Sequence, residues 1–163
     1  MKAASMKDLY VRELQDIYNA QLQELRALPR IADGVRSAEL AAAFAESLRQ
    51  TREQMKRLET ILTGLGQKVG GVKCPAMSGL IQEVDEVLRA DGDDGVRDAG
   101  VIMEAQKVAH YEIAAYGCLH AIARLLGRDE DAQLLDKSLR EEKAIDAVLT
   151  DLAMRRVNSA AAM

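Results

Sequence analysis

The sequence predicts an all-α protein in which four long helices form a bundle and a long segment connects the second helix to the third. Three observations lead to this prediction. The chain of 163 residues is poor in aromatic residues, at 3%, and rich in residue types that favour helices. Its apolar residues recur every three or four positions, as they do on one face of a helix. Glycine, proline and aspartate cluster between the predicted helices, and none of these clusters resembles a linker, so we expect one domain over residues 1–163.

The first two helices are predicted over residues 5–32 and 37–63. Ser5 can accept a hydrogen bond from the free N–H groups of the first turn, which favours a helix start there. Pro29 is expected to bend the first helix because it lacks a backbone N–H. Gly34 suits the left-handed turn that ends many helices. A short turn between the two helices makes them antiparallel neighbours.

The last two long helices are predicted over residues 94–126 and 130–157, with Gly127 as the cap between them. About 30 residues separate this pair from the first, and they contain a short helix over residues 76–89. Two helical hairpins joined by such a crossover form the ferritin-like topology, not a simple up-down bundle.

Charge and composition exclude several classes of function. The net charge is −4 and the basic residues are scattered among acids, so we expect neither a nucleic-acid nor a membrane partner. The beginning of the chain lacks a secretory apolar segment, which favours a cytoplasmic protein with reduced thiols. Cys74 is expected to anchor the crossover, Cys118 to lie in the core, and His110 to bond a group across the crossover. We assign no catalytic residue, because no nucleophile triad, phosphate loop or dinucleotide fingerprint is present.

Polar residues occur on helix faces that should be apolar and buried. The first helix places Gln21 on such a face, and the third long helix places Glu112 there. The candidate residues on the second and fourth long helices are Gln50, Thr51, Gln54, Glu142 and Asp146. Glu142 and Asp146 are four positions apart, so we expect their carboxylates on one face.

Two interpretations follow from these residues. Buried carboxylates are costly unless they are paired or bind a metal, so the layer can be a carboxylate-bridged dimetal site. Alternatively, the glutamines can satisfy the acids in a hydrogen-bonded polar layer. The Glu-x-x-His motifs of dimetal bundles are missing, which favours the polar layer or a site for a single metal ion.

Four segments resemble a known family over nearly the whole chain, from about Met6 to Asn158. They are DLYVRELQDIYNAQLQELRALPRIA, VKCPAMSGLIQEVDEVL, QKVAHYEIAAYGCL and LREEKAIDAVLTDLA. They are similar to segments of the YciF/YciE-like family of small bacterial ferritin-like proteins linked to stress response. The resemblance implies a four-helix bundle, usually dimeric, with a dimetal-type site and no settled biochemical activity.

The resemblance also implies which acids have been replaced. The family commonly has glutamate where this chain has Gln21, Gln50 and Ala109, while Glu112, Glu142 and Asp146 are kept, and Gln54 is kept as glutamine. The expected metal residues are therefore Glu112, Glu142 and Asp146, with Gln21, Gln50 and Gln54 as neutral partners.

These residues lead to two expectations for function. The first is a stress-associated protein with a degenerate dimetal site, acting as a structural or partner-binding homodimer, with no cofactor and no enzyme activity. The alternative is a non-haem carboxylate protein that holds one weakly bound iron or manganese ion, with a redox or metal-handling role. If the protein is an enzyme, we expect a di-iron-type oxidoreductase.

Overall fold

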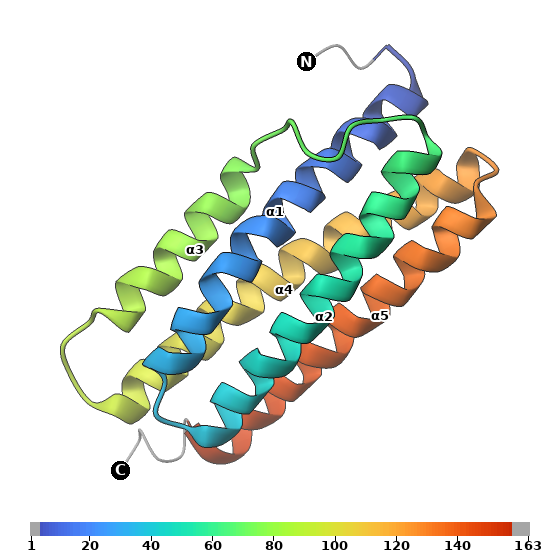
Figure 1. The fold of residues 1–163 in the computed structure, drawn as a ribbon. Coiled ribbons are helices and arrows are strands. Elements are labelled where there is room, and N and C mark those ends of the chain that lie inside the picture. Colours follow the sequence, from blue (N-terminus) through green and yellow to red (C-terminus); the bar gives the residue numbers. More distant parts are fainter. Residues whose placement is uncertain (1–3, 158–163) are drawn as a thin grey trace.

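The computed structural model describes residues 4–157, and the described chain is helical apart from its turns and one longer loop (Figure 1). The helices are α1 (Met6–Gly34), α2 (Ala38–Gly64), α3 (Pro75–Leu88), α4 (Asp94–Leu125) and α5 (Asp129–Leu152), followed by a π-helical turn, Ala153–Val157. The all-α prediction is confirmed. Over these residues, none of the helices combines the length and apolar character needed to cross a bilayer.

The helices form two antiparallel hairpins that pack side by side (Figure 1). α1 pairs with α2, and α4 pairs with α5. The loop after α2 crosses one end of the bundle and leads to α3, which runs along the outside against α1 and α4. This is the predicted ferritin-like arrangement of two hairpins joined by a crossover.

The helix ends differ from the prediction in ways that packing explains. α1 continues through Pro29 to Gly34, two residues beyond the expected end. Gly34 serves close packing and not a left-handed turn, because a Cβ there would lie 2.8 Å from Leu88 Cδ2 of α3. Gly127 has a φ of +69°, so it is the left-handed cap that was expected between α4 and α5. The π-helical turn replaces the last five residues of the expected final helix.

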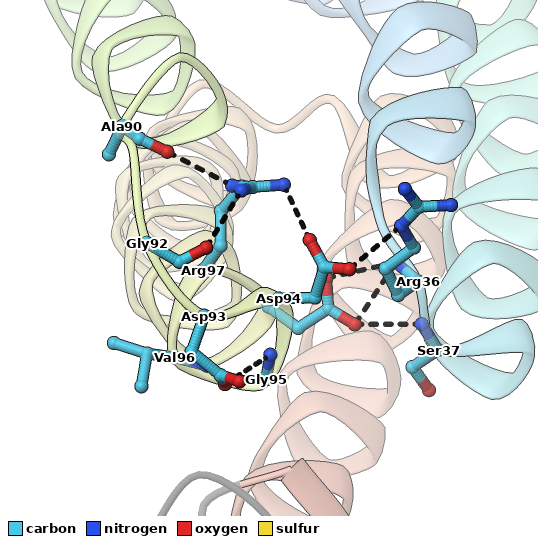
Figure 2. Close-up of polar contacts among 10 residues, drawn as sticks. Arg36, Ser37, Ala90, Gly92, Asp93, Asp94, Gly95, Val96 and Arg97 are labelled. Carbon is cyan, nitrogen blue, oxygen red and sulfur yellow. Dashed lines mark hydrogen bonds and ion pairs between the residues drawn. The ribbon is translucent and has the colours of Figure 1, made fainter.

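Side chains at the start of α4 tie the two hairpins together at one end of the bundle (Figure 2). The buried carboxylate of Asp98 accepts hydrogen bonds from the backbone N–H groups of Arg36 at 3.0 Å and Ser37 at 2.7 Å, in the turn between α1 and α2. Asp94 pairs with Arg36 and with Arg97, and Arg97 also reaches the carbonyl groups that follow α3. These contacts fix the positions of α4 and the α1–α2 turn relative to each other.

The apolar core is divided into two clusters along the bundle. The first cluster includes Leu14, Ile17, Leu58, Leu119 and Leu135. The second includes Leu28, Phe44, Val101, Ile145 and Leu149. On each of the four long helices the residues between these clusters include buried polar side chains. A polar layer therefore crosses the middle of the bundle.

Candidate functional site: a polar layer across the bundle

Two glutamines each face a buried carboxyl group at the centre of the bundle. Gln21 of α1 donates from Nε2 to Glu112 Oε1 of α4 at 2.7 Å. Gln54 of α2 donates from Nε2 to Glu142 Oε1 of α5, also at 2.7 Å. The side chains of Gln21, Gln54 and Glu112 are fully buried, and Glu142 is 5% exposed. One amide–carboxyl pair thus joins α1 to α4, and the other joins α2 to α5.

Sequence reasoning missed a third acid in this layer, Glu24 of α1. Its Oε2 accepts a hydrogen bond from Thr51 Oγ1 of α2 at 3.0 Å. Of the polar residues on this helix, the sequence placed only Gln21 inward, and the observed buried stripe follows Ile17, Gln21 and Leu28. Glu24 lies three residues after Gln21 and four before Leu28, and this spacing is the signal that could have identified it. We define the polar layer as Gln21, Glu24, Thr51, Gln54, Glu112 and Glu142.

Burial and mutual repulsion favour the protonated form of these acids. The pKa of Glu24 is raised to about 8, first by burial of its carboxyl group and then by the charge of Glu142, although part of the residue keeps contact with solvent. Burial also raises the pKa of Glu112 well above its usual range, and the charges of Glu24 and Glu142 raise it further. The pKa of Glu142 is raised by burial, while its hydrogen bond from Gln54 acts in the opposite direction. The layer therefore retains protons near neutral pH.

A half-buried cation close to the layer pairs with an acid outside it. Arg57 of α2 forms an ion pair with Glu141 at 2.6 Å, and its guanidinium also donates to Ser138. Gln54 touches the same Glu141 carboxylate at 3.3 Å. Because Arg57 pairs with Glu141, it forms no ion pair with Glu112 or Glu142. These inner acids have protons and amide N–H donors as their partners.

Several buried oxygens in and beside the layer have no hydrogen-bond partner within the described chain. They are Gln21 Oε1, Gln54 Oε1, Glu112 Oε2 and Tyr116 Oη. The two glutamine oxygens can only accept hydrogen bonds, and the Glu112 oxygen can donate only if it carries a proton. The tyrosine hydroxyl can donate and accept. The centre of the bundle thus holds acceptors that no N–H group of the described chain fills.

A cavity of about 40 Å³ adjoins the layer on the side of the second apolar cluster. Glu24, Thr51, Glu112 and Glu142 line its polar end, and half-buried Gln50 lies along its α2 side. Its apolar walls include Leu28, Phe44, Val84, Ala109, Ile145 and Leu149. Gln50 itself donates to Glu46 at 2.8 Å, which places its amide at the edge of the site.

Asp146 lies outside this layer, contrary to the predicted ligand set. Its Oδ1 is 3.2 Å from His110 Nε2 and accepts a hydrogen bond from Gln106 at the same distance. The inward face of α5 passes through Glu142, Ile145 and Leu149, so Asp146 turns toward α4 and the surface. His110 is largely exposed, and its partner is on α5 and not on the crossover as expected.

The two cysteines have different environments. Cys74 is buried, and its Sγ lies 3.0 Å from the hydroxyl of Tyr111, which donates to Asp16 at 2.8 Å. Burial raises the pKa of the Cys74 thiol, in keeping with an anchor for the crossover. The expectation for Cys118 was wrong, because this residue is exposed on α4 beside a groove that faces α1.

These residues do not fit a two-metal carboxylate centre. Such a centre takes a glutamate from each of two helices and a Glu-x-x-His pair from each of the other two. The polar layer has three carboxyl groups, and both glutamines turn an N–H toward an acid where a ligand would present oxygen. Both histidines of the chain lie elsewhere, since His110 contacts Asp146 and His120 contacts the Ala132 carbonyl. Between residues 4 and 157, no three His, Cys, Asp or Glu side chains are grouped to hold a metal ion.

Comparison with known proteins gives relatives along the whole chain. Residues 5–162 match the family described as Domain of unknown function (DUF892). Protein YciF of Escherichia coli (strain K12) is 41% identical over 162 residues, which cover 99% of this chain and 98% of that protein.

Solved structures give the same relationship. The crystal structure of the E. coli stress protein YciF superposes with a TM-score of 0.91 at 42% identity, over 97% of this chain and 99% of that one. YcfI, a proposed structural protein from Rhodopseudomonas palustris, gives a TM-score of 0.86 at 41% identity, over 90% and 93% of the two chains. A protein from Xanthomonas campestris shares the fold, with a TM-score of 0.78 at 20% identity over 95% of both chains. The polar layer described above therefore lies in a ferritin-like bundle, and the chain belongs to the YciF-like DUF892 family.

Proposed function

We propose that this protein is a stress-associated structural protein of the cytoplasm, which forms a homodimer, binds protein partners and has a hydrogen-bonded polar layer in place of a dimetal centre. One observation carries the proposal: Gln21 and Gln54 each donate an amide N–H to a buried carboxyl group at 2.7 Å. Acids that already have protein donors and retain protons need no metal ion to offset the cost of burial.

The relatives and the surface of α2 support the structural part of the proposal. The E. coli relative is described as a stress protein, and the R. palustris relative as a proposed structural protein. On α2 the run from Ala41 to Ala45 leaves Ala42 and Ala45 exposed. Small side chains on a long helix allow close approach of a second copy, so we place the dimer contact there.

Sedimentation equilibrium tests this role with two variants. Ala42→Arg should shift the protein from dimer to monomer, because it puts a long charged side chain into the contact. Glu112→Gln should leave the dimer and the fold intact, because it changes only the interior. If the wild-type protein is monomeric at micromolar concentration, or if Ala42→Arg stays dimeric, the proposed contact is wrong.

A second candidate function is metal handling at a single weak site for iron or manganese. The unpartnered buried oxygens favour it, since carboxylate and amide oxygens are ligands for hard cations. Glu112 and Glu142 would then supply the carboxylate ligands, with Gln21 and Gln54 turning their oxygens inward. Under this alternative the purified protein contains metal, and Glu112→Gln loses it without unfolding.

A further inference from the structure

We infer that the cavity beside the polar layer binds a small primary alkylammonium ion, whose charged end contacts the acids and whose alkyl end lies among the apolar walls. The inference goes beyond the proposed structural role, although it rests on the polar layer being free of metal. Two features of the cavity carry it, namely the carboxyl groups at one end, with the unpartnered Glu112 Oε2 among them, and the apolar surface at the other.

The polar end of the cavity offers one acceptor that lacks an N–H donor, together with two further carboxyl groups. Glu112 lines the cavity, is fully buried, and its Oε2 has no hydrogen-bond partner within the described chain. Glu24 and Glu142 line the same end. Glu24 accepts from Thr51, and Glu142 accepts from Gln54 and also contacts the carboxyl group of Glu112. An ammonium group brings three N–H donors and a positive charge, so its binding favours release of a proton from these acids and pairs the cation with the carboxylate that forms.

The remainder of the cavity is apolar. Leu28, Phe44, Val84, Ile145 and Leu149 from four helices line this part. The volume of about 40 Å³ gives room for about three water-sized groups, far less than a drug-sized pocket. The cavity therefore suits a ligand of about three or four non-hydrogen atoms, such as ethylammonium or n-propylammonium.

An organic cation fits this site better than a metal ion or a neutral molecule does. A metal ion needs several ligand oxygens converging at about 2 Å. Between residues 4 and 157, no three acids or other metal-ligating side chains are grouped that way. An ammonium group accepts wider spacing because each of its hydrogens can reach a different oxygen at hydrogen-bond distance. A neutral alcohol fills the same volume but supplies one donor and no charge.

Methyl-resolved NMR of the full-length protein tests the inference directly. The probes are ethylammonium and n-propylammonium chloride, compared with n-propanol and with sodium chloride at equal ionic strength. We expect the ammonium ions to shift the methyl signals of Val84, Ile145 and Leu149. The methyl signals of Ile17 and Leu135, in the other apolar cluster, should stay unchanged. Equal shifts with n-propanol or sodium chloride, or shifts spread over both clusters, would overturn the inference.

Variants on α4 give matched controls. Ala109→Leu fills the cavity and should abolish the shifts, whereas Ala114→Leu, at an exposed position on the same helix, should preserve them. Glu112→Gln keeps the shape, removes the carboxyl group that can ionise when the cation binds, and should weaken binding about tenfold, since charge-assisted hydrogen bonds are the stronger ones. If Ala109→Leu does not fold, the inference is tested by comparing ammonium binding to Glu112→Gln with binding to the wild type, and equal binding would overturn it.

Metal analysis of the same samples separates the two proposals. Protein that contains no metal and does not bind the ammonium ions overturns this inference and leaves the proposed function standing. Stoichiometric metal in the polar layer would overturn the proposed function. If the cavity then binds n-propylammonium only after that metal is removed, the inference is overturned for the protein as isolated.

Discussion

Gln21 Nε2 lies 2.7 Å from Glu112 Oε1, and this contact joins the first and fourth helices at the middle of the bundle. The glutamine stabilises the carboxyl group by hydrogen bonding alone, because it carries no charge. The acid therefore keeps most of its desolvation cost whenever it is ionised. This relationship determines how the protein should respond to substitution and to pH.

Glu112→Gln should stabilise the protein near pH 8. The substitution keeps an oxygen that can accept from Gln21, and it removes a buried acid whose pKa is raised by burial and by Glu24 and Glu142. We expect the free energy of unfolding to rise by about 1–2 kcal/mol, as found when buried charges are replaced by groups of similar size. Urea denaturation measures the change. Glu13→Gln, at an exposed position on α1, is the control and should change little. A loss of stability in Glu112→Gln would contradict the description of the layer.

Stability should fall as pH rises through the neutral range. The folded pKa of Glu24 is about 8, whereas an unfolded glutamate titrates near about 4.3. The folded state thus binds a proton that the unfolded chain has lost, and this stabilisation is complete below about pH 4.3 and is lost as pH approaches about 8. Each such group contributes at most about 1.4 kcal/mol per pH unit.

Urea denaturation between pH 5 and 9 measures this slope. Glu24→Gln should flatten it, and Glu13→Gln should leave it unchanged. Acids with a lowered pKa do not interfere, because Glu46, for example, titrates at about 2. A wild-type stability that rises between pH 5 and 8 would show that the layer is not protonated.

Asp98→Asn should destabilise the end of the bundle. The Asp98 carboxylate accepts from the backbone N–H groups of Arg36 and Ser37, so an asparagine loses one acceptor and the charge. We expect a loss of about 1–3 kcal/mol, the usual cost of leaving a buried donor unsatisfied. Asp94→Asn breaks solvent-accessible ion pairs with Arg36 and Arg97 and should cost less than about 1 kcal/mol. Thermal unfolding of the two variants measures the difference. If Asp98→Asn and Asp94→Asn lose the same stability, the buried carboxylate does not stabilise the turn between α1 and α2.

Replacing two glycines of α4 by alanine should change the stability of the protein in opposite directions. A Cβ at position 117 meets nothing within 4 Å, so Gly117→Ala should stabilise by about 0.5–1 kcal/mol through helix propensity. A Cβ at position 100 would lie 2.7 Å from Val87 Cγ1 of α3, and the β-branched valine cannot easily rotate away. Gly100→Ala should therefore destabilise the protein. Chemical denaturation of both variants measures the change in the free energy of unfolding. An increase in both variants would mean that Val87 of α3 does not pack closely against position 100 of α4.

The spacing of residues predicted the fold more fully than the site. Apolar periodicity and turn residues were enough for the helices and the crossover, and they placed Glu112 and Glu142 inward. Periodicity did not determine which edge of a broad apolar stripe faces the bundle centre. Glu24 was missed because it lies at the edge of the stripe that holds Gln21. Asp146 was placed inside by its spacing from Glu142 and by the family resemblance, but it turns toward His110. Close packing of Gly34 on Leu88 could not be read from the sequence, because it depends on the path of α3.

Metal content per chain tests the central claim most directly. The protein is purified without chelator, analysed, incubated with iron, manganese or zinc, and analysed again after removal of free metal. We predict far less than one ion per chain under every condition, and the same value for Glu112→Gln. Near-stoichiometric metal in the wild-type protein that disappears in Glu112→Gln would show that the polar layer is a working metal site, and would contradict the account.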